Sequence, residues 1–168
     1  MTLIVNAKDK TLHAFGRHYP CRIGRAGFTP QTSGREGDNK TPLGTYGIRY
    51  GFYRADRVPV PPCDLTFHAM RADDGWCDAP DDPAYNMPVR LPYPASAEAM
   101  WKDSGVYDIV IVLGHNDSPP QKSLGSAIFL HVARSDDKAT AGCIAVSPDV
   151  MAAILPALKP GAEIVIQA

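Results

Sequence analysis

Glycine and proline are spread so densely through this chain that little room is left for long helices. The sequence has 14 glycines and 16 prolines among 168 residues, against roughly 20 of the two at average usage. Both residues interrupt helices and favour turns, and they follow no collagen-like period here. The chain is therefore expected to be mostly β, with many turns and loops.

The apolar, β-branched segments are short and predict strands. The predicted strands lie at residues 3–5, 11–15, 19–23, 45–50, 65–70, 107–113, 126–133, 143–146 and 163–166. The first two form a hairpin across a polar turn. We expect two short helices: one capped by Ser96 and running through Lys102, and one starting with Ser147 as N-cap and Pro148 at its first position. Residues 24–42 and 58–94 are predicted to be loops or irregular.

Size and charge exclude several classes of protein. A chain of 168 residues and 18.1 kDa predicts one domain, residues 1–168, which buries roughly 70% of its extended surface. The net charge of −1 argues against a general nucleic-acid binder, which needs a basic surplus. No apolar run approaches the ~18 residues of a transmembrane segment, and the first residues lack the basic start and apolar stretch of a signal peptide.

The four cysteines indicate neither a metal site nor a redox pair. Cys21, Cys63, Cys77 and Cys143 include no CxxC spacing, and His68 with Cys63 and Cys77 matches no common zinc spacing. We therefore expect no metal and no other cofactor. A disulfide is possible in principle but is disfavoured without an export signal.

A histidine and a cysteine form the best candidate for a reactive pair. His131 lies in a strand that is otherwise apolar, and Cys143 follows Gly142 at the start of the next predicted strand. This order places the two side chains on adjacent strands, where an imidazole can activate a thiol. The amides of Gly142 and Cys143 would then face a developing oxyanion. A buried structural cysteine beside a satisfied core histidine is the open alternative.

Three segments make this pattern more specific. They are DNKTPLGTYGI at 38–48, AIFLH at 127–131 and TAGCI at 140–144. In this order, and over nearly the whole span from residue 3 to 166, the chain resembles the L,D-transpeptidase catalytic-domain family of bacterial cell-wall enzymes. The stretch GWCD at 75–78 and the dipeptide Tyr85-Asn86 resemble a subgroup with a short, free-standing catalytic domain. Ala141 and Ala145 depart from the family, which commonly has His and Arg there, and the interval from His131 to Cys143 is short.

The resemblance implies a β-sandwich of mixed sheets with one or two short helices. It also implies a cysteine acyltransferase of peptidoglycan stem peptides, with Cys143 as nucleophile, His131 as general acid/base, the Gly142 and Cys143 amides at the oxyanion, and no cofactor. The thioacyl-enzyme would form at a diaminopimelate–D-Ala bond, and an amine acceptor would resolve it.

Two alternatives stay open: resolution by water, as in an L,D-carboxypeptidase or amide hydrolase, and a catalytically idle peptidoglycan-binding module. Family members act in the periplasm or cell wall, so the missing export signal leaves localisation open, as oligomeric state is.

Further residues are candidates for substrate contacts. Arg134 is expected either to bind a substrate carboxylate through its planar guanidinium or to be a solvated loop residue. Trp76, Tyr85 and Asn86 are expected to line the cleft or to lock the irregular segment around it. His115, at the end of the strand next to that of His131, is a candidate for contact with the site.

Overall fold

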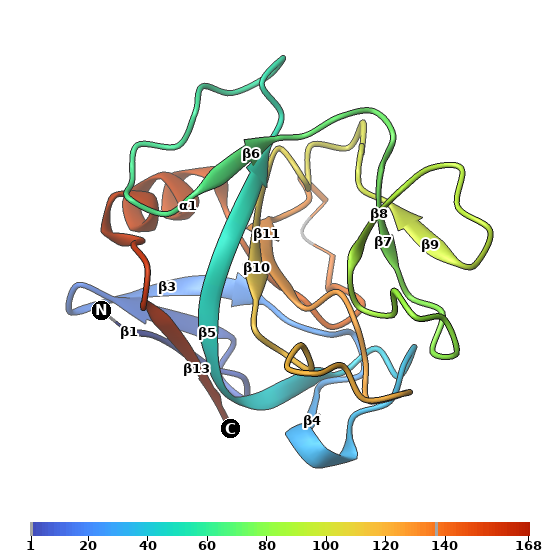
Figure 1. The fold of residues 1–168 in the computed structure, drawn as a ribbon. Helices are drawn as coiled ribbons and strands as arrows, with labels where there is room; N and C mark the ends of the chain where they lie inside the picture. The colour runs from blue at the N-terminus through green and yellow to red at the C-terminus, as the bar shows by residue number, and fades with distance from the viewer. Residues whose placement is uncertain (1, 137) are drawn as a thin grey trace.

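The computed structural model describes residues 2–136 and 138–168. Its main strands and its helix are shown in Figure 1. The strands are β1 (Thr2–Asn6), β2 (Thr11–Ala14), β3 (Arg17–Arg22), β4 (Phe28–Pro30), β5 (Thr41–Tyr53), β6 (Phe67–Ala69), β7 (Asp74–Cys77), β8 (Pro88–Arg90), β9 (Ala97–Ala99), β10 (Ile109–Leu113), β11 (Phe129–Val132), β12 (Ile144–Val146) and β13 (Glu163–Gln167). The helices are α1 (Pro148–Ile154) and the 3-10 turns η1 (Gln31–Ser33) and η2 (Leu155–Ala157). Within the described residues, no helix is long and apolar enough to cross a membrane.

The main sheet is mixed and closes on itself. Its strand order is β10-β11-β12-β3-β2-β1-β13-β5-β4, and β10 also pairs with β5. The long strand β5 makes the corner: its residues 44–47 pair with β13, and its residues 48–53 pair with β10. The pairs β1–β13 and β11–β12 are parallel, whereas β1–β2 is the predicted antiparallel hairpin. The result is the expected mostly β, mixed-sheet sandwich, so the fold class is confirmed.

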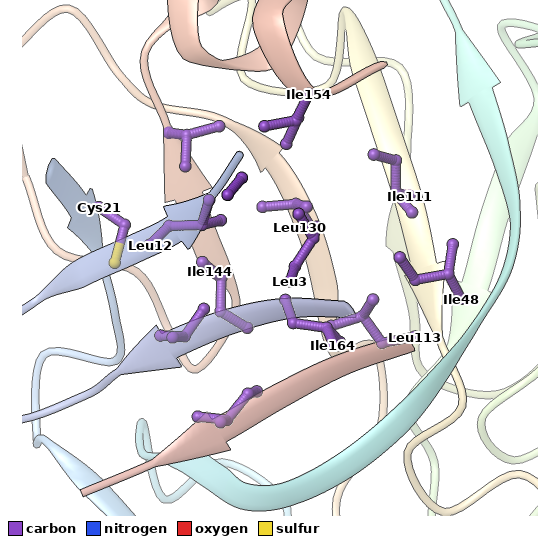
Figure 2. Packing of buried hydrophobic residues seen from close by; sticks show 14 of the residues in the cluster. Leu3, Leu12, Cys21, Ile48, Ile111, Leu113, Leu130, Ile144, Ile154 and Ile164 are labelled. Atoms are coloured by element: carbon purple, nitrogen blue, oxygen red, sulfur yellow. The ribbon is translucent and has the colours of Figure 1, made fainter. Parts of the chain in front are cut away.

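The main core lies between the two walls of this closed sheet. Alternate residues of its strands point inward, as the period of two requires; they include Leu3, Leu12, Ile48, Ile111, Leu130, Ile144 and Ile164 (Figure 2). Helix α1 adds Ile154 to the same cluster. Its predicted cap is present, since the Ser147 hydroxyl accepts a hydrogen bond from the Val150 amide at 3.3 Å.

A smaller antiparallel sheet, β8-β7-β9, covers the outer face of β10 and β11 (Figure 1). Between the two lies a second apolar cluster that includes Trp76, Met100, Val110, Phe129 and Cys143. The candidate nucleophile therefore belongs to this second layer and not to the main core.

The helix predicted from Ser96 to Lys102 is wrong. Residues 97–99 form strand β9, which pairs with β7, and Met100 is buried in the second cluster. A helix of about seven residues is marginal without tertiary packing, so pairing with β7 and burial of Met100 decide the conformation. Helix α1 has the same length but forms, because its apolar face packs on the main core.

Candidate active site

The neighbouring parallel strands β11 and β12 bring the candidate pair together. His131 is in register with Ala145, and Cys143 precedes Ala145 by two residues. Side chains two residues apart on a strand share a face, so Cys143 and His131 lie on the same face of the sheet. The intervening Ile144 and its neighbour Leu130 point into the main core instead.

The thiol of Cys143 is nearly enclosed and protonated. Its side chain is held between two backbone groups: Sγ donates to the Ala127 carbonyl at 3.2 Å and accepts from the Phe129 amide at 3.4 Å. Burial is the main reason that the pKa of Cys143 rises from 9.0 to about 12, and the charge of Glu98 adds to it. The pair at rest is therefore not a thiolate–imidazolium ion pair.

The imidazole of His131 is held neutral in one tautomer. Its Nδ1 lies 2.8 Å from the Val132 carbonyl oxygen, which only accepts, so Nδ1 donates and Nε2 keeps its lone pair. Burial lowers the pKa of His131 from 6.5 to about 4, although the carbonyls of Val132 and Val106 oppose this shift. His131 is therefore a neutral base with a free acceptor nitrogen at neutral pH.

The turn before Cys143 is clamped by two threonine hydroxyls. Thr140 Oγ1 donates to the Cys143 carbonyl at 2.6 Å and accepts from the Gly142 amide at 3.1 Å. Thr41 Oγ1 donates to the Gly142 carbonyl at 2.8 Å. Gly142 has φ +143°, and a Cβ there would come within 2.9 Å of the Lys40 carbonyl oxygen, so only glycine fits. Within residues 2–136 and 138–168, the Cys143 amide has no hydrogen-bond partner, whereas the Gly142 amide is engaged by Thr140.

Cys143 and His131 line one cleft, with a volume of about 440 Å³. Its walls come from the loop of residues 34–40, the loop of residues 124–128 and the turn of residues 138–143, together with Glu98, Lys102 and Tyr107. The part of the chain that the structure describes has no group of three or more His, Cys, Asp or Glu side chains placed to hold a metal ion. All four cysteines are free thiols. The cleft thus places together a thiol, a neutral imidazole and a backbone amide that has no partner among the described residues.

Comparison with known families decides what kind of domain holds this cleft. Residues 2–166 match the family model YkuD, the L,D-transpeptidase catalytic domain. The chain belongs to this family. The resemblance drawn from the three sequence segments is thereby confirmed over nearly the whole chain. No curated protein matches the chain.

Solved structures of L,D-transpeptidases are similar at low identity. L,D-transpeptidase 1 of Mycobacterium tuberculosis is 15% identical with a TM-score of 0.43, over 99% of this chain and 58% of that one. The helical cell shape determining protein Pgp2 of Campylobacter jejuni is 14% identical with a TM-score of 0.48, over 98% and 46%. The chain therefore spans about half the length of these two proteins.

Two of the predicted substrate contacts of this L,D-transpeptidase domain do line the cleft. Arg134 is one, but its guanidinium makes two hydrogen bonds of 3.0 Å to Asp136. His115 is the other: its Nε2 lies 3.2 Å from the Leu124 carbonyl oxygen, and its buried Nδ1 has no hydrogen-bond partner among the described residues. Burial lowers the pKa of His115. Substrate contact by either residue stays a prediction.

Trp76, Tyr85 and Asn86 are absent from the described lining of the cleft and stand behind its wall. The Asn86 side chain uses both its ends: Nδ2 donates to the carbonyls of His115 and Asn116, and Oδ1 accepts from Trp76 Nε1 and the Ala127 amide. The carbonyl of Ala127 in turn accepts the thiol proton of Cys143. This network favours a role in locking the segment around the cleft. Direct contact of Trp76, Tyr85 or Asn86 with a substrate stays a prediction.

Tyr85 reaches the cleft wall from behind in a similar way. Its hydroxyl donates to the Glu36 carboxylate and accepts from the Gly125 amide at 3.0 Å. Because both partners line the cleft, Tyr85 joins two loops of its wall. The hydroxyl of Tyr85 is thereby engaged both as donor and as acceptor.

Sequence reasoning missed three residues on the remaining wall. Tyr107 packs its ring edge-on against His131, with centroids 5.2 Å apart, and donates its hydroxyl to Glu98 Oε1 at 2.9 Å. Lys102 Nζ lies 3.2 Å from the same oxygen. Glu98 and Lys102 were hidden by the wrong helix prediction for this segment. Tyr107 could have been found, because it is an aromatic residue at the start of the strand predicted at residues 107–113, next to the predicted strand of His131.

Proposed function

We propose that this protein is a cysteine acyltransferase of peptidoglycan stem peptides, an L,D-transpeptidase. The observation that supports this most is the placement of Cys143 and His131 on one face of two paired strands, inside one cleft of about 440 Å³. Membership of the L,D-transpeptidase catalytic-domain family gives the reaction class. The acceptor and the natural stem remain part of the proposal.

Acylation starts from a neutral pair. The thiol proton turns from the Ala127 carbonyl to Nε2 of His131 as Sγ attacks the carbonyl carbon of the diaminopimelate–D-Ala bond. Proton removal during attack fits a thiol whose pKa is raised to about 12, because little thiolate exists beforehand. The tautomer fixed by Val132 leaves Nε2 free to act as general base.

The tetrahedral oxyanion takes a hydrogen bond from the Cys143 amide, which has no partner in residues 2–136 and 138–168. A second donor from Gly142 requires its amide to leave the Thr140 hydroxyl. The C–N bond then breaks, His131 returns the proton to the leaving D-Ala amine, and a thioester remains on Cys143.

An acceptor amine attacks the thioester in the second step. His131 takes the proton of that amine, the C–S bond breaks, and the Cys143 sulfur recovers its proton. The products are a cross-linked dimer and the free enzyme. Water in place of the amine gives the carboxypeptidase reaction with the same residues.

Incubation with purified disaccharide-tetrapeptides tests the proposal. Dimers together with free D-Ala are the expected products, and the Cys143→Ala protein should give neither. Release of D-Ala without dimers would assign the protein to the carboxypeptidase alternative. Binding of the wall without any release would indicate the idle module and overturn the proposal.

A further inference from the structure

Glu98 and Lys102 form a pair of opposite charges inside the cleft that holds Cys143. Tyr107 connects this pair to the reactive residues, because its ring packs on His131 while its hydroxyl donates to Glu98 Oε1. The charge of Glu98 also contributes to the raised pKa of the Cys143 thiol. The charged pair is therefore part of the same site.

The backbone fixes both charged residues. Glu98 is in register with Trp76 in the small sheet. The Lys102 carbonyl accepts a hydrogen bond of 2.9 Å from Arg54, whose guanidinium lies 3.5 Å from the centre of the Trp101 ring. The segment is thus held at both ends, and such preorganisation reduces the entropy lost on binding a ligand.

The pair has unused hydrogen-bonding capacity. Glu98 uses Oε1 for Tyr107 and Lys102, and its Oε2 has no hydrogen-bond partner among residues 2–136 and 138–168. Within the same residues, the Lys102 ammonium has Glu98 as its one ion-pair partner and lies 5.5 Å from the centre of the Tyr107 ring, although an ammonium has three donors. Two other charged groups of the cleft are already engaged: Arg134 by a carboxylate, and both oxygens of Asp38 by backbone amides.

We propose that Glu98 and Lys102 form a subsite for an amino-acid zwitterion, with the ligand's ammonium on Glu98 and its carboxylate on Lys102. The inference rests on the proposed function, because the side chain of diaminopimelate in a stem ends in these two groups on one carbon. The side chains of Lys102 and Glu98 are 31% and 29% exposed, and an ion pair that is partly open to water contributes little to stability by itself. Charge-assisted hydrogen bonds inside a partly dehydrated cleft are stronger than those on an open surface.

Binding to the Cys143→Ala protein tests the subsite without any chemistry. Calorimetric titration would compare a tetrapeptide stem that has its free side-chain amine with the same stem acetylated at that amine. Glu98→Gln should weaken binding of the free-amine stem about tenfold, as expected for one lost charge-assisted contact, and should leave the acetylated stem unaffected. Glu163→Gln, an exposed glutamate of β13 outside the cleft, is the matched control and should change neither.

Glutamine keeps an acceptor for Tyr107. A merely structural role of Glu98 therefore predicts that the Cys143→Ala protein binds each stem equally well with and without Glu98→Gln. Equal affinities, or an equal loss for both stems, would overturn the subsite. Lys102→Met gives the second arm: it should weaken binding of a stem with a free side-chain carboxylate and leave unchanged the binding of a stem in which that group is amidated. An equal effect on both stems would overturn the assignment of Lys102.

The wild-type thiol then identifies which stem occupies the subsite. Slower acylation in Glu98→Gln, seen as a raised KM with kcat unchanged, assigns the donor stem. Unchanged acylation with fewer dimers and more hydrolysis assigns the acceptor stem. If no thioester forms even in the otherwise wild-type protein, the proposed function fails, while the titrations still decide the subsite.

Discussion

Strands β11 and β12 have two buried faces that differ in polarity and hardly in exposure. One face contributes Leu130 and Ile144 to the main core, both fully buried. The other contributes His131 and Cys143, which are 6% and 9% exposed. Adjacent residues thus pack the main core on one side and form the proposed reactive pair on the other.

The difference shows how burial tunes a reactive pair. Apolar side chains gain about 1.5–3 kcal/mol each from full burial, so the core face stabilises the fold. On the cleft face, the same loss of water disfavours charge, and it raises the pKa of Cys143 while lowering that of His131. Each polar group meets backbone partners that fix its proton, so that both members of the pair are neutral.

Removal of the base should produce the largest effect on the cleft face. His131→Ala should slow acylation of Cys143 by about 10²- to 10⁴-fold, the usual contribution of general acid–base catalysis. Stopped-flow or timed mass spectrometry of thioester formation measures this rate. His115→Gln is the comparison: near-normal rates in His131→Ala combined with a strong loss in His115→Gln would reassign the base.

Truncation on the core face should cost stability instead of reactivity. Leu130→Ala removes a fully buried side chain and should lower the free energy of unfolding by about 2–5 kcal/mol. Urea unfolding measures this change, and the acylation rate of the remaining folded protein should stay within about threefold. Loss of acylation without loss of stability would mean that the two faces are not separable.

The two faces should also differ in how the free energy of unfolding depends on pH. Burial lowers the folded pKa of His131 from 6.5 to about 4, so the unfolded chain binds more protons between these values. Stability therefore falls as the pH drops through this window, by roughly 3 kcal/mol at 1.36 kcal/mol per pH unit. His131→Gln should remove this part of the slope, and Leu130→Val should not; equal slopes in His131→Gln and the parent would contradict the buried neutral imidazole.

The smallest predicted effect concerns the support behind the cleft face. Trp76→Phe keeps an aromatic ring against Phe129 but deletes the Nε1 donor to Asn86. One lost hydrogen bond should lower stability by about 1 kcal/mol, measured by thermal or urea unfolding. A loss as large as that of Leu130→Ala would show that Asn86 holds far more of the wall than its local bonds indicate.

Local sequence signals predicted the elements whose patterns are self-contained. The first hairpin, the apolar strands around Val110, Leu130 and Ile144, and the Ser147 cap with Pro148 all follow from residue type and spacing. The order of His131, Gly142 and Cys143 likewise placed two reactive side chains on neighbouring strands. These features depend on residues close in the chain.

The features that sequence reasoning missed depend on distant partners. Strand β9 replaces a predicted helix because β7 pairs with it. Asn86 joins the small sheet to the loops before β11 through four hydrogen bonds to residues 10 to 41 positions away. The Tyr107–Glu98 contact could not be inferred before β9 was known, because a helix would have pointed Glu98 elsewhere.

Every step proposed for the cleft requires the thiol of Cys143 as the nucleophile. Intact-mass analysis after exposure to a tetrapeptide donor stem, and separately to a carbapenem, tests it most directly. We expect a single acyl adduct that peptide mapping locates at Cys143, and none in a Cys143→Ala protein of unchanged stability. An unmodified wild-type protein, or an adduct on Cys21, Cys63 or Cys77, would contradict it.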